Sequence, residues 1–124
     1  MIREIPCHLV TDSSNNTCMA VSTKDWSWTN SAGMAWNFKK GETSDGHSRG
    51  KYFRHFDAWL LAALCHDQDC VRANEEGSYK MRMAGDNAYK FNLFDLGAPK
   101  STVLWSYTGV SIYTYKLKLM GKLK

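Results

Sequence analysis

Hydrophobic and polar positions alternate along the N-terminal part of the chain. Four segments alternate or are rich in β-branched and aromatic residues, which is typical of strands: Arg3–Val10, Thr17–Thr23, Asp25–Thr29 and Met34–Lys39. Turn-forming residues separate them at Asp12–Asn16 and at Asn30–Gly33. The pattern predicts a small antiparallel sheet of three or four strands.

A polar loop, Gly41–Lys51, follows, and after it the apolar spacing becomes helical. Three helices are predicted: Phe56–His66, Ser78–Leu96 and Lys100 to about Met120. Their boundaries rest on Ser78 as a cap, Pro99 before the third helix, and Gly97 and Gly121 as stops. The middle of the third segment, TGVSIYTY, is also compatible with a strand.

The fold class predicted from these elements is α+β: a small N-terminal antiparallel sheet followed by about three helices. Residues 1–55 are expected to be mainly strands and loops, and residues 56–124 mainly helices. A chain of 124 residues is expected to form a single domain.

Composition narrows the classes of partner. The chain holds five Trp, six Tyr and five Phe, which favours an aromatic core or an aromatic contact surface. The net charge of +4 is mild, and no aromatic residue interleaves the C-terminal lysines of KLKLMGKLK, so nucleic-acid binding is not favoured. The longest apolar run, Ala58–Cys65, is far too short to span a bilayer, and no signal peptide is recognisable.

Cysteine spacing gives no zinc motif. Cys7, Cys18, Cys65 and Cys70 form no Cys-x-x-Cys pair. In the cytoplasm, where the chain is expected to stay, these side chains are predicted to be reduced thiols.

The first predicted helix ends in a cluster of reactive side chains, within the stretch AALCHDQDC. If the helix ends at His66, its dipole favours the charged imidazole, and Asp67 and Asp69 need a cation, a metal or water to offset the unfavourable dipole. In the alternative interpretation, His66 is a capping residue that bonds the last carbonyls.

Two further carboxylates are candidates for the same site. Asp45 lies in the glycine-bearing loop TSDGHS, where its alternative role is to bond the backbone of an exposed tight turn. On a helix, Asp86 shares a face with apolar residues, so it needs a partner there. Arg82 or Lys90 would pair with it on the surface, and His66 would pair with it inside. We expect Asp45, His66 and Asp86 to lie close together.

In this order, the motifs resemble a small tailed-phage and prophage family, domain of unknown function thirteen fifty-three. The matching residues are Asp45, Gly46 and Ser48 in the loop, His66 and Asp67, and Asp86, Tyr89, Leu93 and Gly97 in the later helix. The resemblance covers roughly residues 41–115. It implies a phage origin and no established activity.

Two chemistries suit the predicted cluster. Asp45, His66 and Asp86 are a sensible ligand set for one divalent metal with open positions for water. The same residues, with Asp67, are equally sensible as a metal-free histidine base oriented by carboxylates. Ser48 is then a hydroxyl that orients a ligand, or a nucleophile.

Two functions follow, and whether the protein is an enzyme stays open. The first is a bacteriophage accessory protein that binds another protein, either as a virion component or as an inhibitor of a host protein. Its location is then the host cytoplasm or the virion, and the Trp and Tyr content suits an interface. The alternative is a phage metal-dependent or His/Asp hydrolase-like enzyme.

Overall fold

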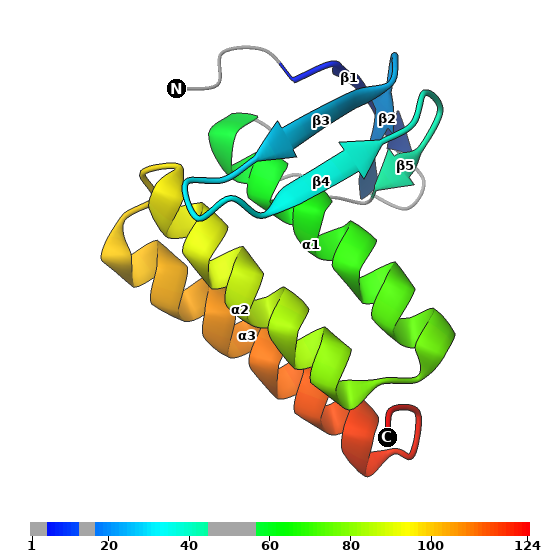
Figure 1. The fold of residues 1–124 in the computed structure, drawn as a ribbon, viewed down its shortest axis with the longest axis vertical. Helices are drawn as coiled ribbons and strands as arrows, with labels where there is room; N and C mark the ends of the chain where they lie inside the picture. The colour runs from blue at the N-terminus through cyan, green and yellow to red at the C-terminus, as the bar shows by residue number, and fades with distance from the viewer. Residues whose placement is uncertain (1–4, 13–16, 45–56) are drawn as a thin grey trace. The chain divides into compact units, whose positions relative to one another are not determined.

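The computed structural model describes residues 5–12, 17–44 and 57–124. Within these residues, five short strands precede three long helices (Figure 1). The strands are β1 (Cys7–Asp12), β2 (Thr17–Ser22), β3 (Trp26–Thr29), β4 (Ala35–Phe38) and β5 (Thr43–Ser44). The helices are α1 (Asp57–Glu76), α2 (Tyr79–Asp95) and α3 (Lys100–Leu119). The prediction of an α+β fold is confirmed.

The chain divides into two compact units, Met1–Leu64 and Cys65–Lys124. The boundary lies inside α1. The first unit holds the strands and the beginning of α1, and the second holds the rest of α1 with α2 and α3.

The strands of the first unit form two antiparallel sheets. β2 lies between β1 and β5, with Cys7 opposite Ser22 and Val21 opposite Thr43. β3 and β4 form a separate pair. The sequence predicted one sheet, and it did not predict β5, which comes from the polar loop Gly41–Lys51.

Aromatic pairs hold the β3–β4 hairpin together. Trp26 lies opposite Phe38, and the two rings stack with centroids 4.3 Å apart. At the turn, the side-chain oxygen of Asn30 accepts hydrogen bonds from the backbone N–H groups of Ala32 and Met34. Gly33 has φ 85°, a left-handed conformation that glycine adopts without strain. The turn predicted at Asn30–Gly33 is confirmed.

Helix α1 is longer than the sequence predicted. It continues from Asp57 to Glu76, so the expected end at His66 is wrong. After His66 the helix becomes less buried, with residues 67–70 half-buried and most of residues 71–76 exposed, and the backbone stays helical throughout. Leu60, Ala63 and Leu64 are buried, as predicted. The side chain of Trp59 lies outside the described residues.

All three helices end in the same way, at a glycine. Gly77, Gly97 and Gly121 have φ of 62°, 86° and 76°. In each case the next residue's N–H bonds back to the carbonyl five residues earlier, as for Ser78 to Ala73. This is the Schellman motif, which satisfies the last carbonyls of a helix. The predicted stops at Gly97 and Gly121 are confirmed, as is the cap at Ser78, whose hydroxyl accepts from the Met81 N–H.

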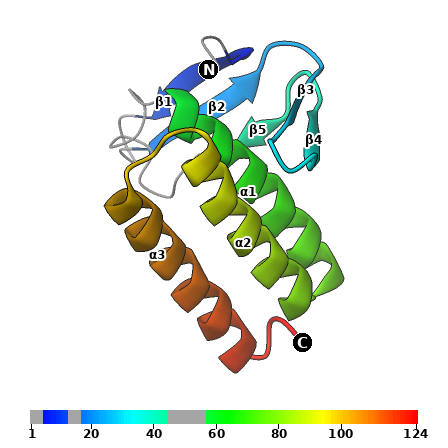
Figure 2. The same ribbon diagram turned by 60° about the vertical axis from the view of Figure 1, so that its left-hand side comes forward.

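Helices α2 and α3 of the second unit run antiparallel, side by side (Figures 1 and 2). The buried apolar residues of this unit are Ala73, Tyr89, Leu93, Ala98, Val103, Leu117 and Leu123, together with Cys65. The C-terminal backbone returns to the α1–α2 turn, where the Lys124 N–H donates to the Gly77 carbonyl at 2.8 Å. The strand alternative for TGVSIYTY is wrong, because the segment is helical throughout.

Helices α1 and α2 approach closely at Gly85, and the contact gives a first prediction. A Cβ at Gly85 would lie 2.9 Å from the Cβ of Asp69. Gly85→Ala should therefore lower the free energy of unfolding by about 1–3 kcal/mol, although alanine is the better helix former by about 1 kcal/mol. Urea denaturation followed by circular dichroism measures the change.

Gly109 is the matched control, because it lies inside α3 and a Cβ there meets none of the described atoms within 4 Å. Gly109→Ala should raise the free energy of unfolding by about 0.5–1 kcal/mol. Equal stabilisation by both substitutions would contradict the close approach at Gly85.

Candidate functional site

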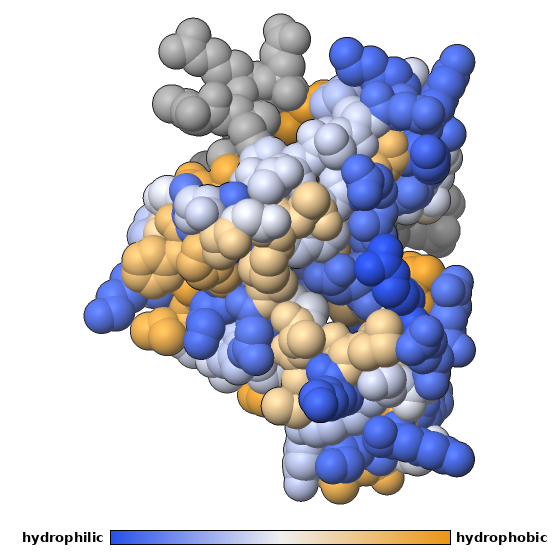
Figure 3. Space-filling model, in the orientation of Figure 1, coloured by the Kyte–Doolittle hydropathy of each residue, from blue (hydrophilic) through white to orange (hydrophobic). Residues whose placement is uncertain are grey.

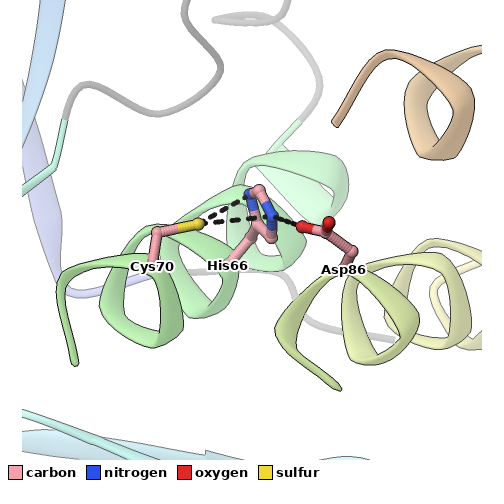
Figure 4. A group of neighbouring side chains, drawn as sticks. All are labelled: His66, Cys70 and Asp86. Carbon is pink, nitrogen blue, oxygen red and sulfur yellow. Dashed lines mark hydrogen bonds and ion pairs between the residues drawn. The ribbon is translucent and has the colours of Figure 1, made fainter. Parts of the chain in front are cut away.

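A histidine and an aspartate from different helices meet inside the second unit. His66 Nε2 lies 2.7 Å from Asp86 Oδ1 (Figure 4). His66 comes from α1 and Asp86 from α2. Asp86 is only 2% exposed. The expectation that these two side chains lie close together is confirmed.

The second oxygen of Asp86 is held by helix α3. The Thr114 hydroxyl donates to Asp86 Oδ2 at 2.6 Å. Arg82 Nε donates in turn to Thr114 Oγ1 at 3.2 Å. Because the guanidinium polarises the hydroxyl that it donates to, Thr114 becomes a better donor to the carboxylate. Arg82 thus reaches Asp86 through Thr114.

Two further contacts fix the orientation of the charged groups. Arg82 Nη1 donates to Asn74 Oδ1 of α1 at 2.9 Å. The Tyr89 ring stacks on the His66 imidazole with centroids 4.6 Å apart and an interplanar angle of 28°. The imidazole is therefore held by a ring contact as well as by its hydrogen bond.

We call His66, Arg82, Asp86 and Thr114 the polar cluster. A carboxylate without partners in such a place would cost several kcal/mol. Here both of its oxygens accept hydrogen bonds, and a guanidinium lies one hydroxyl away. Because its members come from all three helices, the polar cluster ties α1, α2 and α3 together.

Cys70 borders the polar cluster. It lies one turn after His66 on α1, with its Sγ 3.5 Å from Nε2 and 3.9 Å from Nδ1 of the imidazole. Burial raises the pKa of Cys70 to about 12, although the Arg82 charge acts in the opposite direction. At neutral pH the side chain is therefore a neutral thiol, which is a poor nucleophile.

The other candidate residues are Asp45, Ser48, Asp67 and Asp69. Asp45 and Ser48 lie outside the described residues. Asp67 is half-buried in the middle of α1, and so is Asp69. The helix-end interpretation of these residues is wrong, because the helix runs on to Glu76 and its last carbonyls are far from His66.

Two residues that contact the His66–Asp86 pair, Cys70 and Thr114, were not predicted from the sequence as its neighbours. Cys70 was counted among the reactive side chains of AALCHDQDC and as a reduced thiol, but it was not expected beside Asp86. Thr114 lies in a segment rich in β-branched residues, where one buried hydroxyl gives no distinguishing signal. Among the cysteines that the structure describes, Cys7, Cys65 and Cys70 are free.

Helix α3 carries a second feature, an exposed row on the side opposite Thr114. The row consists of Trp105, Thr108, Ile112, Tyr115 and Leu119, and we call it the α3 stripe. Its large apolar members are well exposed: Trp105 80%, Ile112 64% and Leu119 70%. Figure 3 shows one face of the molecule, and hydrophobic side chains reach the surface over the helices on that face as well.

Comparisons with protein-family models, with curated proteins and with solved structures gave no match. The resemblance to the phage family therefore stays a prediction. Across the described residues, none of the helices combines the length and the apolar content required to cross a membrane.

The polar cluster gives a second prediction. Thr114→Val preserves shape and β-branching but removes the donor to Asp86 and the acceptor for Arg82. It should lower the free energy of unfolding by about 1–3 kcal/mol, because buried polar groups lose their partners. The control Thr108→Val, at an exposed position of the same helix, should change it by less than about 0.5 kcal/mol. Equal effects of the two substitutions would contradict the role given to Thr114.

Proposed function

We propose that this protein is a protein-binding module and that the α3 stripe is its docking surface. The observation that carries the proposal is the exposure of Trp105, Ile112 and Leu119, three large apolar side chains on one face of a helix. Contiguous exposed apolar surface on a soluble domain is typical of an interaction site. Tryptophan and tyrosine, both present in the stripe, are enriched among the residues that dominate binding energy.

The spacing of the stripe favours a helical partner. Its members follow one another at intervals of three, four, three and four residues. This is the heptad spacing by which two helices interlock side chains along a seam. The opposite face of α3 already packs inside the protein, through residues such as Val103 and Leu117. A helix that is apolar on both faces has room for two neighbours.

The charges beside the stripe favour an acidic partner. Lys116 and Lys118 occupy the positions where coiled coils place their charged pairs, and α3 contains no acidic residue. The ammonium of Lys118 lies over the Tyr79 ring of α2, so Lys116 is the one of the two that faces a partner more directly. Two more lysines, Lys122 and Lys124, follow the helix. A second copy of this chain would add like charges. The partner proposed is therefore an amphipathic helix with apolar residues at heptad spacing and acidic residues beside them.

The size of the stripe indicates modest affinity. Covering the exposed parts of Trp105, Ile112, Tyr115 and Leu119 would bury roughly 500–600 Å² on this side of an interface. A standard stable interface buries about 800 Å² per partner. The expected complex is therefore transient, with a dissociation constant on the order of 1–100 μM.

The setting of this binding role is proposed from the sequence. The resemblance to a phage family favours a phage accessory protein whose partner belongs to the virion or to the host. A second candidate, a metal-dependent or His/Asp hydrolase-like enzyme, is supported by the His66–Asp86 contact, since a carboxylate commonly orients a catalytic imidazole. The burial of His66 favours the binding role over this alternative, since a buried imidazole is not open to a substrate.

A designed peptide tests the proposal. The peptide has three heptads with Ile and Leu at the seam and Glu at the flanking positions, and its like charges keep it from pairing with itself. Calorimetry should show one peptide per chain with micromolar affinity, and a matched peptide with Lys in place of Glu should bind at least about tenfold more weakly. Ile112→Glu should abolish binding, because it places a charge in the apolar seam.

Val71→Glu is the matched control, since Val71 is 57% exposed on α1, outside the stripe, and this variant should bind as the wild type does. Equal binding of both peptides, or of neither, would contradict an acidic helical partner. A wild-type dimer in sedimentation experiments that Ile112→Glu dissociates would assign the stripe to self-association instead.

A further inference from the structure

We propose that His66, Cys70 and Asp86 form a binding site for one divalent transition-metal cation of the zinc type, a role beyond the docking function of the α3 stripe. One ligand atom from each residue lies within 4.8 Å of the others. In the view of Figure 4, the Cys70 and Asp86 side chains approach the His66 imidazole from its two sides; Cys70 and His66 come from α1 and Asp86 from α2.

The ligand atoms lie near the positions that a tetrahedral ion requires, and two of the side chains must adjust to reach them. Zinc bonds of about 2.3 Å to sulfur and 2.0–2.1 Å to nitrogen place those two ligand atoms about 3.5 Å apart. Cys70 Sγ is 3.5 Å from His66 Nε2 but also 3.9 Å from Nδ1, whereas a tetrahedral ion bonded to Nε2 would hold the sulfur more than about 4.5 Å from Nδ1. A bound ion therefore requires the Cys70 side chain to turn toward the outer side of Nε2. The corresponding nitrogen–oxygen separation is about 3.3 Å. Since His66 Nε2 and Asp86 Oδ1 are 2.7 Å apart, a bound ion requires the carboxylate to move by only about half an ångström.

The positions in the helices make this a chelating set. His66 and Cys70 are four residues apart on α1, so they project from the same face. Asp86 approaches that face from α2 and can offer Oδ1 while Oδ2 still accepts the Thr114 hydroxyl. Such outer hydrogen bonds to a ligand are usual in metal sites and orient the ligand.

The chemistry of the set selects the class of ion. A thiolate, an imidazole and a carboxylate together favour zinc, cobalt or nickel over magnesium and calcium, which take oxygen ligands. On binding, the thiol proton of Cys70 goes to solvent, and the imidazole keeps one proton, which moves from Nε2 to Nδ1. The thiolate and the carboxylate then neutralise the two charges of the ion. Three protein ligands leave the fourth position for water.

In the metal-free protein the Cys70 thiol makes only long contacts with the imidazole, 3.5 Å to Nε2 and 3.9 Å to Nδ1. His66 Nε2 has a single proton, and the shorter contact, 2.7 Å to Asp86, takes it. The 3.5 Å approach of Cys70 to the same nitrogen therefore adds little as a hydrogen bond in the metal-free protein.

Cobalt(II) tests the site directly, because thiolate ligation gives it a strong near-ultraviolet charge-transfer band and tetrahedral geometry gives it visible bands. The full chain, stripped with a chelator and kept reduced by a phosphine, is titrated with cobalt chloride. Both sets of bands should saturate at one ion per chain, and one equivalent of zinc should abolish them. Absence of the bands from the wild-type protein would overturn the proposal.

Variants assign the ligands. Cys70→Ser should lose the charge-transfer band and bind cobalt at least about tenfold more weakly, and Asp86→Asn should weaken binding to a similar degree. Cys7→Ser is the matched control, since Cys7 is a free thiol in the other unit, and it should leave the titration unchanged. A charge-transfer band that survives Cys70→Ser would exclude this sulfur as the ligand.

A measurement on the wild-type chain removes any dependence on the folding of the variants. Zinc should slow the alkylation of Cys70 by iodoacetamide at least about tenfold, because a coordinated thiolate is shielded, and should leave Cys7 unaffected. Mass spectrometry of the digested protein gives both rates. Equal rates at Cys70 with and without zinc would overturn the proposal.

Discussion

The buried carboxylate of Asp86 is the constraint on which the helical unit depends. A charge that is 2% exposed is tolerated only where hydrogen bonds and an opposite charge replace water. Asp86 receives these from His66 on α1 and from Thr114 on α3, with Arg82 behind Thr114. The requirement of one residue thus fixes the relative register of three helices.

Helix α3 uses two opposite faces for two different roles. The face of α3 that carries Thr114 packs inside the unit, and the opposite face carries the exposed α3 stripe. Stability of the unit and recognition of a partner therefore use different side chains of the same helix. The proposed metal site draws on the interior set, since His66 and Asp86 are already held in place by the hydrogen bonds of the polar cluster and Cys70 is the only addition. An ion there would join α1 to α2 at the point where the polar cluster already joins them.

Sequence patterns predicted the local structure well and the tertiary contacts in part. The strand segments, the Asn30–Gly33 turn and the glycine stops depend on interactions between residues close in sequence, so they could be predicted directly from it. The end of α1 could not, because DQDC resembles a helix exit although its polar residues only mark where the helix becomes less buried. The His66–Asp86 contact was predicted because an inward carboxylate needs a partner. Thr114 was missed, since nothing in a run of β-branched residues shows which hydroxyl is buried.

The most direct test of the central role of Asp86 is a double-mutant cycle with Thr114, measured by urea denaturation. If the hydroxyl stabilises the fold mainly by serving the buried charge, Thr114→Val should cost at least about 1 kcal/mol less in an Asp86→Asn background than in the wild type, since a hydrogen bond to a charged group is roughly twice as strong as a neutral one. The same cost in both backgrounds, within about 0.3 kcal/mol, would contradict the account, because Thr114 would then act through packing alone.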